Sequence, residues 1–313
     1  MNYPYVNGQI KVIESKILGK NEFSKLIKTQ KTDFMKTLID LGYGSSGPSL
    51  ESVINQELKN VKNLLDEISP QKKYTDLFFL ASDALNIKAL IKRQVFGINH
   101  LDIFVDTGVI DEKALNKAIF EEDYSLLKKE HRKLLTNIIE TVKDEDNPRV
   151  ISAKIDNLVY QFIIDNLGFG VPALKTYFEA SIDFANLITY VRIKKLGWSL
   201  DEFGLMFLEN GKIPQSVFEE MFNQTNELQI RTLREYYDEK LSKILKEYYE
   251  VLDLNLLERR LDDLILKLVK EYQYDSFGIG PIIYYYLKKQ AEAKNIRAIY
   301  ASSEIELIDL LDY

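Results

Sequence analysis

The stretch Asp83-Ala84-Leu85-Asn86-Ile87 decides how this chain folds, because its pattern returns twice further along the sequence. Asp183-Phe184-Ala185-Asn186-Leu187 repeats it, and Glu292-Ala293-Lys294-Asn295-Ile296 repeats it with glutamate as the acid. The three asparagines lie 100 and 109 positions apart. Self-similarity at a long period is typical of a chain built from repeated structural units. The sequence therefore predicts three related modules of about one hundred residues each.

The residues before each motif predict a helical hairpin. Pro172 and Pro281 stand fourteen positions before the second and third asparagine, and Pro70 lies two positions out of register in the first copy. Proline is tolerated in the first turn of a helix, because the N–H that it lacks would be unpaired there. Each copy should therefore hold a turn and then a long helix of about 24 residues, spanning about 36 Å. Amphipathic stretches precede the three turns at 50–68, 150–167 and 254–274.

A glycine and then a short helix are expected to follow the long helices. Gly97 and Gly197 each stand eleven positions after the asparagine of the motif, where a helix would end on a residue with positive φ. Beyond them, residues 104–110 and 207–213 share the phrase Phe-x-acid-x-Gly-x-Ile. The N-terminus supplies a third segment of this kind, in which Gly19 follows Asn7 by twelve positions.

These features predict an all-α fold. Long intervals lack proline and glycine and carry apolar residues at helical spacing, whereas alternating strand-like runs are hard to find. We expect three helical modules, 1–96, 97–196 and 197–313, related by a pseudo-threefold axis in a ring or funnel that the N-terminal segment closes. An open solenoid is the alternative, but three weakly similar copies without polar caps fit a closed object better.

Composition excludes several classes of function. The 313 residues contain no cysteine, which excludes disulfides, thiolate zinc sites and thiol catalysis. The net charge is −7, and its 48 acidic and 41 basic residues are mixed without a basic block, which argues against nucleic acid as a partner. No apolar run approaches the roughly 20 residues that cross a bilayer, and the N-terminus does not resemble a signal peptide. We expect a chain without a membrane span.

The motifs associated with catalysis are incomplete, so no enzyme activity, metal or cofactor is expected. Residues 42–47 match Gly-x-Gly-x-x-Gly, but a helical pattern precedes them where a dinucleotide site needs a strand. The pair Asp262-Asp263 lacks the third aspartate of a magnesium site, because position 266 is leucine. His100 and His131 have no histidine partner at helical spacing, and no Walker A sequence is present.

The acid and the asparagine of each motif lie three residues apart and hence on one helix face. We expect Asp83, Asn86, Asp183, Asn186, Glu292 and Asn295 to tie each long helix to a neighbouring segment through side-chain-to-backbone bonds. The alternative is a ring of contacts that lines a central cavity and grips partners. Arg192, Arg297 and Lys92 are candidate charge partners. Tyr284 and Tyr285 are candidate interface residues, and the alternative for such tyrosines is a place in the core.

The C-terminal stretch resembles a known family. Residues 280–297, with Gly280-Pro281, a tyrosine-bearing apolar run and Glu292-x-x-Asn295-x-Arg297, are similar to the C-terminal signature of the C subunit of V/A-type rotary ATPases, called d in eukaryotes. Gln290 departs from the usual glutamate of that signature. The start, Tyr5-Val6-Asn7, is also similar, and the resemblance covers the whole chain.

The resemblance implies a non-catalytic adaptor in the rotor. A member of this family is expected to be a funnel of three helical domains on the cytoplasmic face of the membrane, peripheral to it and without cofactor. Its partners would be the D and F subunits of the central shaft and the proteolipid (c/K) ring, with transient contact to the membrane stator. It would pass torque between shaft and ring for ATP-coupled H⁺ or Na⁺ transport. A generic all-α scaffold that binds peptides or proteins is the alternative.

Overall fold

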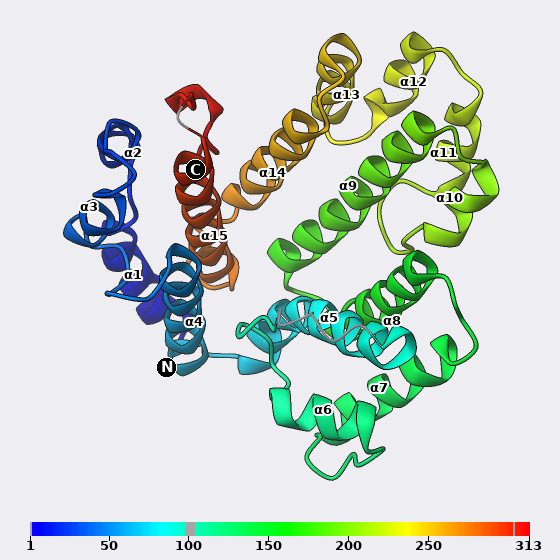
Figure 1. Ribbon diagram of the computed structural model, residues 1–313, viewed down its shortest axis with the longest axis horizontal. Helices are drawn as coiled ribbons and strands as arrows, with labels where there is room; N and C mark the ends of the chain where they lie inside the picture. Colours follow the sequence, from blue (N-terminus) through cyan, green and yellow to red (C-terminus); the bar gives the residue numbers. More distant parts are fainter. Residues whose placement is uncertain (1, 98–103, 303) are drawn as a thin grey trace. The chain divides into compact units, whose positions relative to one another are not determined.

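The computed structural model describes residues 2–97, 104–302 and 304–313. Over these residues the chain forms α-helices and two short 3-10 helices, and no β-strand (Figure 1). The predicted all-α class is therefore confirmed. The helices are α1 (Tyr3–Glu14), α2 (Lys20–Ile27), α3 (Phe34–Asp40), α4 (Leu50–Ile68), α5 (Lys72–Phe96), α6 (Glu112–Phe120), α7 (Lys129–Val142), α8 (Pro148–Leu167), α9 (Pro172–Leu196), α10 (Leu200–Met206), α11 (Gln215–Phe222), α12 (Asn226–Thr232), η1 (Leu233–Glu235), α13 (Lys240–Val251), α14 (Leu254–Lys270), α15 (Gly280–Ala301) and η2 (Leu307–Asp309).

The helices are grouped into two compact units. Unit 1 comprises Met1–Thr75, Gly170–Ala173 and Leu266–Tyr313, and unit 2 comprises Asp76–Phe169 and Leu174–Ile265. Helices α5, α9 and α14 each contribute residues to both units. The division into three modules and their closure into a ring stay predictions.

The predicted hairpin helices form where the sequence places them. Helix α4 begins after Ser49, whose hydroxyl accepts a hydrogen bond from the N–H of Ser52 and so caps the helix. Helix α8 begins at Pro148, two residues earlier than predicted, because Asn147 caps it through the N–H of Arg149. Helix α14 ends at Lys270, four residues before the predicted limit, and turns follow it.

The three long helices have the expected length and ends. Helices α5 and α9 hold 25 residues each and α15 holds 22. Proline occupies the first turn of α9 and of α15, whereas α5 starts two residues after Pro70. Gly97 and Gly197 follow the ends of α5 and α9 with φ of 64° and 69°, a conformation that costs glycine little. Both glycine predictions are confirmed. The predicted short helix follows Gly197 as α10, whereas residues 104–110 after Gly97 form no helix.

Unit 1 is built around α15. Fifteen of the 22 residues of this helix are buried, so the helix lies inside the core of the unit. Helices α1, α2 and α4 pack against it. Helix α15 contributes Ala293, Ile296 and Ile299 to the core. These side chains belong to one hydrophobic cluster with side chains of the N-terminal helices, among them Phe23, Leu26, Phe34, Leu38 and Ile54.

The beginning of the chain is fixed to the turn that precedes α15. Asn7 of α1 is buried, and its side-chain amide donates hydrogen bonds to the carbonyl oxygens of Asp275, Ser276 and Gly278 at 3.0, 3.3 and 3.1 Å. These carbonyl groups belong to an irregular turn and have no helical partner. One side chain of the first helix therefore satisfies several backbone acceptors about 270 residues away.

Unit 2 contains an aromatic cluster between α9, α10 and α11. The rings of Tyr190, Phe203, Phe207 and Phe218 lie with centroids 5.3 to 6.0 Å apart in tilted or edge-to-face contact. Such arrangements place the positive edge of one ring against the negative face of another. The cluster holds the short helices α10 and α11 against the long helix α9.

Candidate functional site

The repeated acid and asparagine of α9 both bind the backbone of one connecting segment. The side-chain amide of Asn186 donates to the carbonyl of Leu208 at 2.8 Å, and the N–H of Leu208 donates back to Asn186 Oδ1 at 2.8 Å. One helical turn away, the carboxylate of Asp183 accepts the N–H groups of Lys212 at 2.9 Å and Ile213 at 3.0 Å. The pair thus satisfies four backbone groups of a segment that has no regular structure of its own.

The same geometry occurs on α5. Asn86 exchanges two hydrogen bonds with the backbone of Val105, at 3.1 Å from its amide and 2.8 Å to its oxygen. Asp83 accepts the N–H of Val109 at 2.7 Å and that of Ile110 at 3.2 Å. We call each acid with its asparagine, three residues on, a motif clamp.

The third motif clamp, on α15, holds both ends of the chain. Asn295 exchanges hydrogen bonds with the backbone of Leu311 at 3.0 and 2.8 Å. Glu292 accepts the N–H of Leu18 at 2.7 Å. The first two motif clamps hold residues that follow their own helix, whereas this one holds a residue near each terminus of the chain.

Burial distinguishes the motif clamps from a docking surface. The six side chains are at most 2 % exposed, and they are Asp83, Asn86, Asp183, Asn186, Glu292 and Asn295. A buried polar group costs stability unless it is hydrogen-bonded, and these groups bond to backbone of the same chain. They present no free surface to a partner in this structure.

Two glycines make the close approach of the aspartates possible. A Cβ atom on Gly108 would lie 2.2 Å from Asp83 Oδ1, and one on Gly211 would lie 2.0 Å from Asp183 Oδ1. Neither glycine has a positive φ, so the requirement is for space and not for backbone conformation. The phrase Phe-x-acid-x-Gly-x-Ile now has a physical reading: the residue after Phe pairs with the asparagine, Gly admits the carboxylate, and the last two residues donate to it.

Each of two carboxylates also has a side-chain neighbour. The hydroxyl of Tyr237 donates to Asp183, and burial nevertheless raises the pKa of Asp183 from 3.8 to about 6. Burial also raises the pKa of Glu292, whose second oxygen lies 2.5 Å from the ammonium group of Lys289. Lys289 is itself held by Glu57 at 2.9 Å.

Two of the three candidate charge partners, the arginines, bind acids outside the motifs. Arg192 pairs with Glu258 of α14, and Arg297 binds Glu51 of α4 through contacts of 2.9 to 3.1 Å. Neither arginine pairs with a motif acid; these acids accept hydrogen bonds from backbone N–H groups, and Glu292 also binds Lys289. The third candidate, Lys92, forms no ion pair within the described residues, and it lines a pocket of unit 2.

The tyrosines of α15 lie in the core and not on a surface. Tyr284 is 1 % exposed and Tyr285 is 6 % exposed, so neither offers an interface in this structure. Burial raises the pKa of Tyr284 to about 12. Both tyrosines therefore lie where the alternative to an interface role, a place in the core, would put them.

The sequence analysis missed a set of ion pairs between hairpins. Lys88 of α5 binds Asp156 of α8 at 2.7 and 2.8 Å. Together with the Arg192 and Arg297 pairs, this links α5 to α8, α9 to α14, and α15 to α4. The three hairpins are α4 with α5, α8 with α9, and α14 with α15. The long second helix of each hairpin therefore carries a cation that binds the first helix of the next hairpin. In the third hairpin this cation binds the first helix of the first hairpin. Lys88 and Arg297 each lie two residues after the asparagine of their motif. This shared spacing was the only feature of the sequence that could have indicated the ion pairs.

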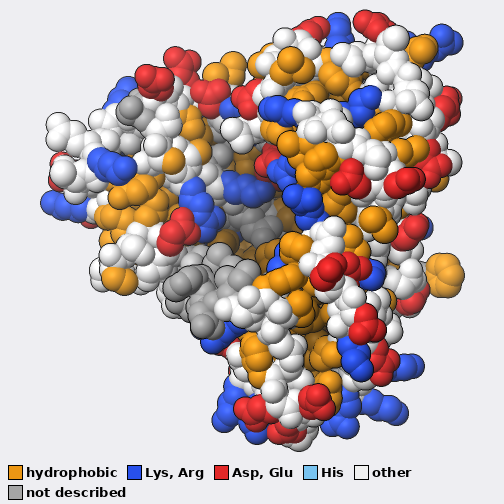
Figure 2. Space-filling model, turned by 45° about the vertical axis from the view of Figure 1, so that its right-hand side comes forward, with side chains coloured by type: hydrophobic (Ala, Val, Ile, Leu, Met, Phe, Trp, Pro, Cys, Tyr) orange, Lys and Arg blue, Asp and Glu red, His pale blue; other side chains and the backbone are white. Residues whose placement is uncertain are grey.

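The described part of the chain offers no cluster of side chains for a metal ion. No group of three or more histidine, aspartate or glutamate side chains lies close enough there to hold one. His131 of α7 is partly buried, and burial lowers its pKa, whereas His100 and Asp102 lie outside the described residues. No helix among the described residues is long and apolar enough to cross a membrane. On the face drawn in Figure 2, acidic, basic and apolar side chains are interspersed.

Comparisons with known proteins cover nearly the whole chain. The profile of the family described as ATP synthase (C/AC39) subunit matches residues 6–304. The C subunit of the A-type ATP synthase of Desulfurococcus sp. is 23% identical over 95% of this chain and 85% of its own length. The C subunit of the V-type ATP synthase of Thermus thermophilus is 22% identical over 95% and 93%, and that of the V-type sodium ATPase of Enterococcus hirae is 24% identical over 96% and 93%.

The need for space beside the motif acids is tested by adding one methyl group. We expect Gly211→Ala to destabilise the protein by about 3 kcal/mol, because its Cβ would displace the Asp183 carboxylate and break the motif clamp. Gly8→Ala is the matched control, since Gly8 lies within α1 with no atom near its Cβ position, and it should stabilise by about 0.5 kcal/mol. Urea unfolding of both variants measures the difference. Equal effects would contradict the role of Gly211.

The raised pKa of Asp183 predicts a specific pH dependence. The folded protein binds the proton of Asp183 more tightly than the unfolded chain does, so this group favours folding below pH 3.8, and that contribution is lost as pH rises to about 6. The free energy of unfolding of the wild type should therefore fall by about 2–3 kcal/mol relative to Asp183→Asn between those limits. Urea titrations of both proteins from pH 4 to pH 7 measure this. A constant difference would show that the carboxylate titrates normally.

Proposed function

This chain belongs to the ATP synthase (C/AC39) subunit family, and we propose that it is the non-catalytic rotor adaptor of a V/A-type rotary ATPase. In this role it links the D–F shaft to the proteolipid (c/K) ring and transmits torque for ATP-coupled H⁺ or Na⁺ transport. The observation that carries the proposal is the family match over residues 6–304, which includes all three motif clamps. Relatives named as C subunits of A-type and V-type ATPases, matched over most of their length, support it.

The motif clamps suit a part that transmits torque. A torque coupler must be stiff. Where an irregular segment can slide along a helix, part of the applied torque deforms the coupler and does not reach its partner. Each motif clamp fixes such a segment by hydrogen bonds with distances between 2.7 and 3.2 Å, made by buried side chains. Close-packed interiors transmit strain well, and buried hydrogen bonds keep the packing in one arrangement. We assign the six motif residues to anchoring and not to partner contact.

The modules 1–96, 97–196 and 197–313 are proposed to form a closed pseudo-threefold ring. The cyclic order of the ion pairs, α5 to α8, α9 to α14 and α15 to α4, supports this, because an open array would leave its last hairpin unlinked to its first. The motif clamp on α15 adds a second link, since it holds Leu18 and Leu311 together. In the complex such a ring would lie at the cytoplasmic face of the membrane, peripheral to it, with transient contact to the stator.

The proposal is tested by isolating the complex from membranes of the source organism with a tag on this chain. We expect the D and F subunits and the proteolipid to co-purify after gentle solubilisation, and high salt to release them, because a mixed-charge surface docks through screened interactions. Mass spectrometry identifies the partners, and circular dichroism checks that the recovered chain is folded.

A second measurement on the same membranes addresses coupling. Membranes from a strain that lacks this chain should hydrolyse ATP without ATP-driven ion uptake, and adding back the purified protein should restore uptake. A folded chain that recovers neither shaft nor proteolipid would contradict the adaptor role and favour a general helical scaffold.

A further inference from the structure

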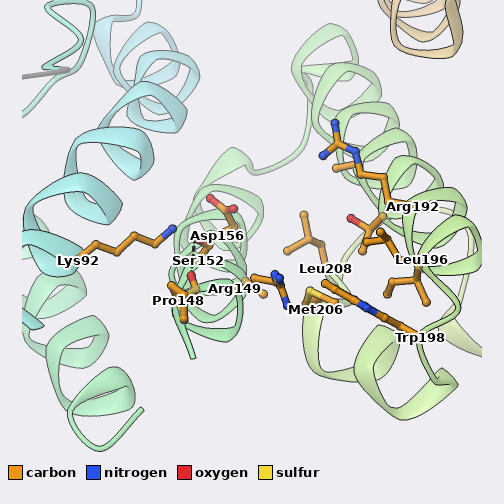
Figure 3. A pocket seen from close by; sticks show the side chains of 14 residues that line it. Lys92, Pro148, Arg149, Ser152, Asp156, Arg192, Leu196, Trp198, Met206 and Leu208 are labelled. Atoms are coloured by element: carbon orange, nitrogen blue, oxygen red, sulfur yellow. Dashed lines mark hydrogen bonds between the residues drawn. The ribbon is translucent and has the colours of Figure 1, made fainter. Parts of the chain in front are cut away.

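A pocket of about 680 Å³ lies in unit 2 between α5, α8, α9 and the segment around α10. It is lined by Lys92 from α5, by Arg149 and Asp156 from α8, and by Arg192 from α9 (Figure 3). Its mouth is open to solvent, because Leu196 is 59% exposed and the side chain of Arg192 is 55% exposed. The motif clamps do not use this pocket, apart from the side chain of Leu208 on its wall.

Positive charge in the pocket is incompletely neutralised. Arg192 has Glu258 as its partner, and Asp156 is bound by Lys88 at 2.7 and 2.8 Å. Within the described residues, Lys92 and Arg149 form no ion pair with an acid. The pocket therefore holds two cations for which the described part of the chain supplies no counter-ion of their own.

The environment of Lys92 disfavours its charged form. Burial lowers the pKa of Lys92, and the nearby ammonium group of Lys88 lowers it further. Asp156 opposes this shift only in part, since its oxygens are bonded to Lys88. A carboxylate that entered the pocket would restore a favourable environment for the charged lysine.

The rest of the lining is apolar and aromatic. Arg149 lies over the ring of Trp198, with 4.1 Å between the guanidinium carbon and the ring centroid. Met206, Leu208, Ile193 and Leu196 complete the wall around this pair. Arginine stacked on tryptophan keeps its donor groups free in the plane of the guanidinium, and both residues are common at the centres of protein interfaces. The lining thus suits an acidic group carried beside a bulky apolar one.

We propose that this pocket is the docking site for a protein segment that carries a carboxylate next to an apolar side chain, and that the segment belongs to the rotor shaft. The identity of the partner rests on the proposed function. Charge complementarity selects the acidic group, and Lys92 and Arg149 receive it. The volume admits a few protruding side chains and not a whole helix, so the contact fixes register between two rigid bodies.

Charge reversal tests the pocket against the purified D–F pair of the same organism. The variant Lys92→Glu/Arg149→Glu should bind the pair at least tenfold more weakly than the wild type. Lys113→Glu/Lys133→Glu is the matched control, because it changes the same charge at two exposed residues of unit 2 that do not line the pocket, and its affinity should stay within twofold. The neutral variant Lys92→Gln/Arg149→Gln, which is less disruptive, should lose affinity to a smaller extent. Biolayer interferometry gives the affinities, and thermal melts check folding.

Trp198 supplies an independent readout, since it is the only tryptophan of the chain. A saturating D–F pair whose own tryptophans are replaced by phenylalanine should reduce acrylamide quenching of Trp198 about twofold or more. The same pair bound without any change in quenching would overturn the assignment of the pocket.

The outcomes separate the two proposals. If the wild type binds the D–F pair, and if Lys92→Glu/Arg149→Glu and Lys113→Glu/Lys133→Glu both bind it with the wild-type affinity, the pocket is not the docking site. That result would leave the adaptor role unaffected. A wild type that does not bind the D–F pair would overturn the adaptor role and the shaft as occupant together. If charge reversal weakens binding to the detergent-solubilised proteolipid ring and spares the shaft, the shaft is the wrong partner.

Discussion

The structure depends on one interaction, in which a buried asparagine side chain pairs with both hydrogen-bonding groups of a backbone residue in an irregular segment. Every backbone N–H and C=O that is removed from water needs a partner, and a connecting segment has no helix or sheet to provide one. Asn86, Asn186 and Asn295 provide it from the long helices, at distances of 2.8 to 3.1 Å. The acid three residues earlier accepts further N–H groups, so that side chains of a helix organise the chain beside it.

The third motif clamp extends this principle from local order to chain closure. Glu292 replaces the aspartate of the other copies, and its side chain, longer by one methylene group, binds Leu18 near the start of the chain while Asn295 binds Leu311 near its end. The buried amide of Asn7 adds a second long-range link, to the turn before α15. Interactions that join residues far apart in sequence limit the motion of both segments at once. In a proposed torque coupler, the segments near both termini are thus held against α15.

Much of the fold was predictable, because helices are determined by local signals. Pro172 and Gly197 mark helix ends for reasons of backbone geometry, and the spacing of the repeated motif was sufficient to identify it. The pairing of Arg192 with Glu258, and of Lys88 with Asp156, could not be predicted, since it depends on which helices meet. The tyrosines of α15 were ambiguous because aromatic residues are found both in cores and at interfaces, and only the packing around the helix decides between the two. The pocket at Trp198 could not be predicted from the sequence for a related reason, because its lining residues come from three separate stretches of the chain.

Amide hydrogen exchange at residue resolution tests the central claim most directly. If the motif clamps hold the connecting segments, the amides of Leu208 and Leu311 must open before they exchange, although neither residue is in a helix. The account predicts that they exchange about as slowly as the interior amides of α9, and at least roughly a hundredfold more slowly than the loop at residues 44–47. Exchange at the rate of that loop would contradict it, because the paired asparagine side chains would then not hold the backbone in solution.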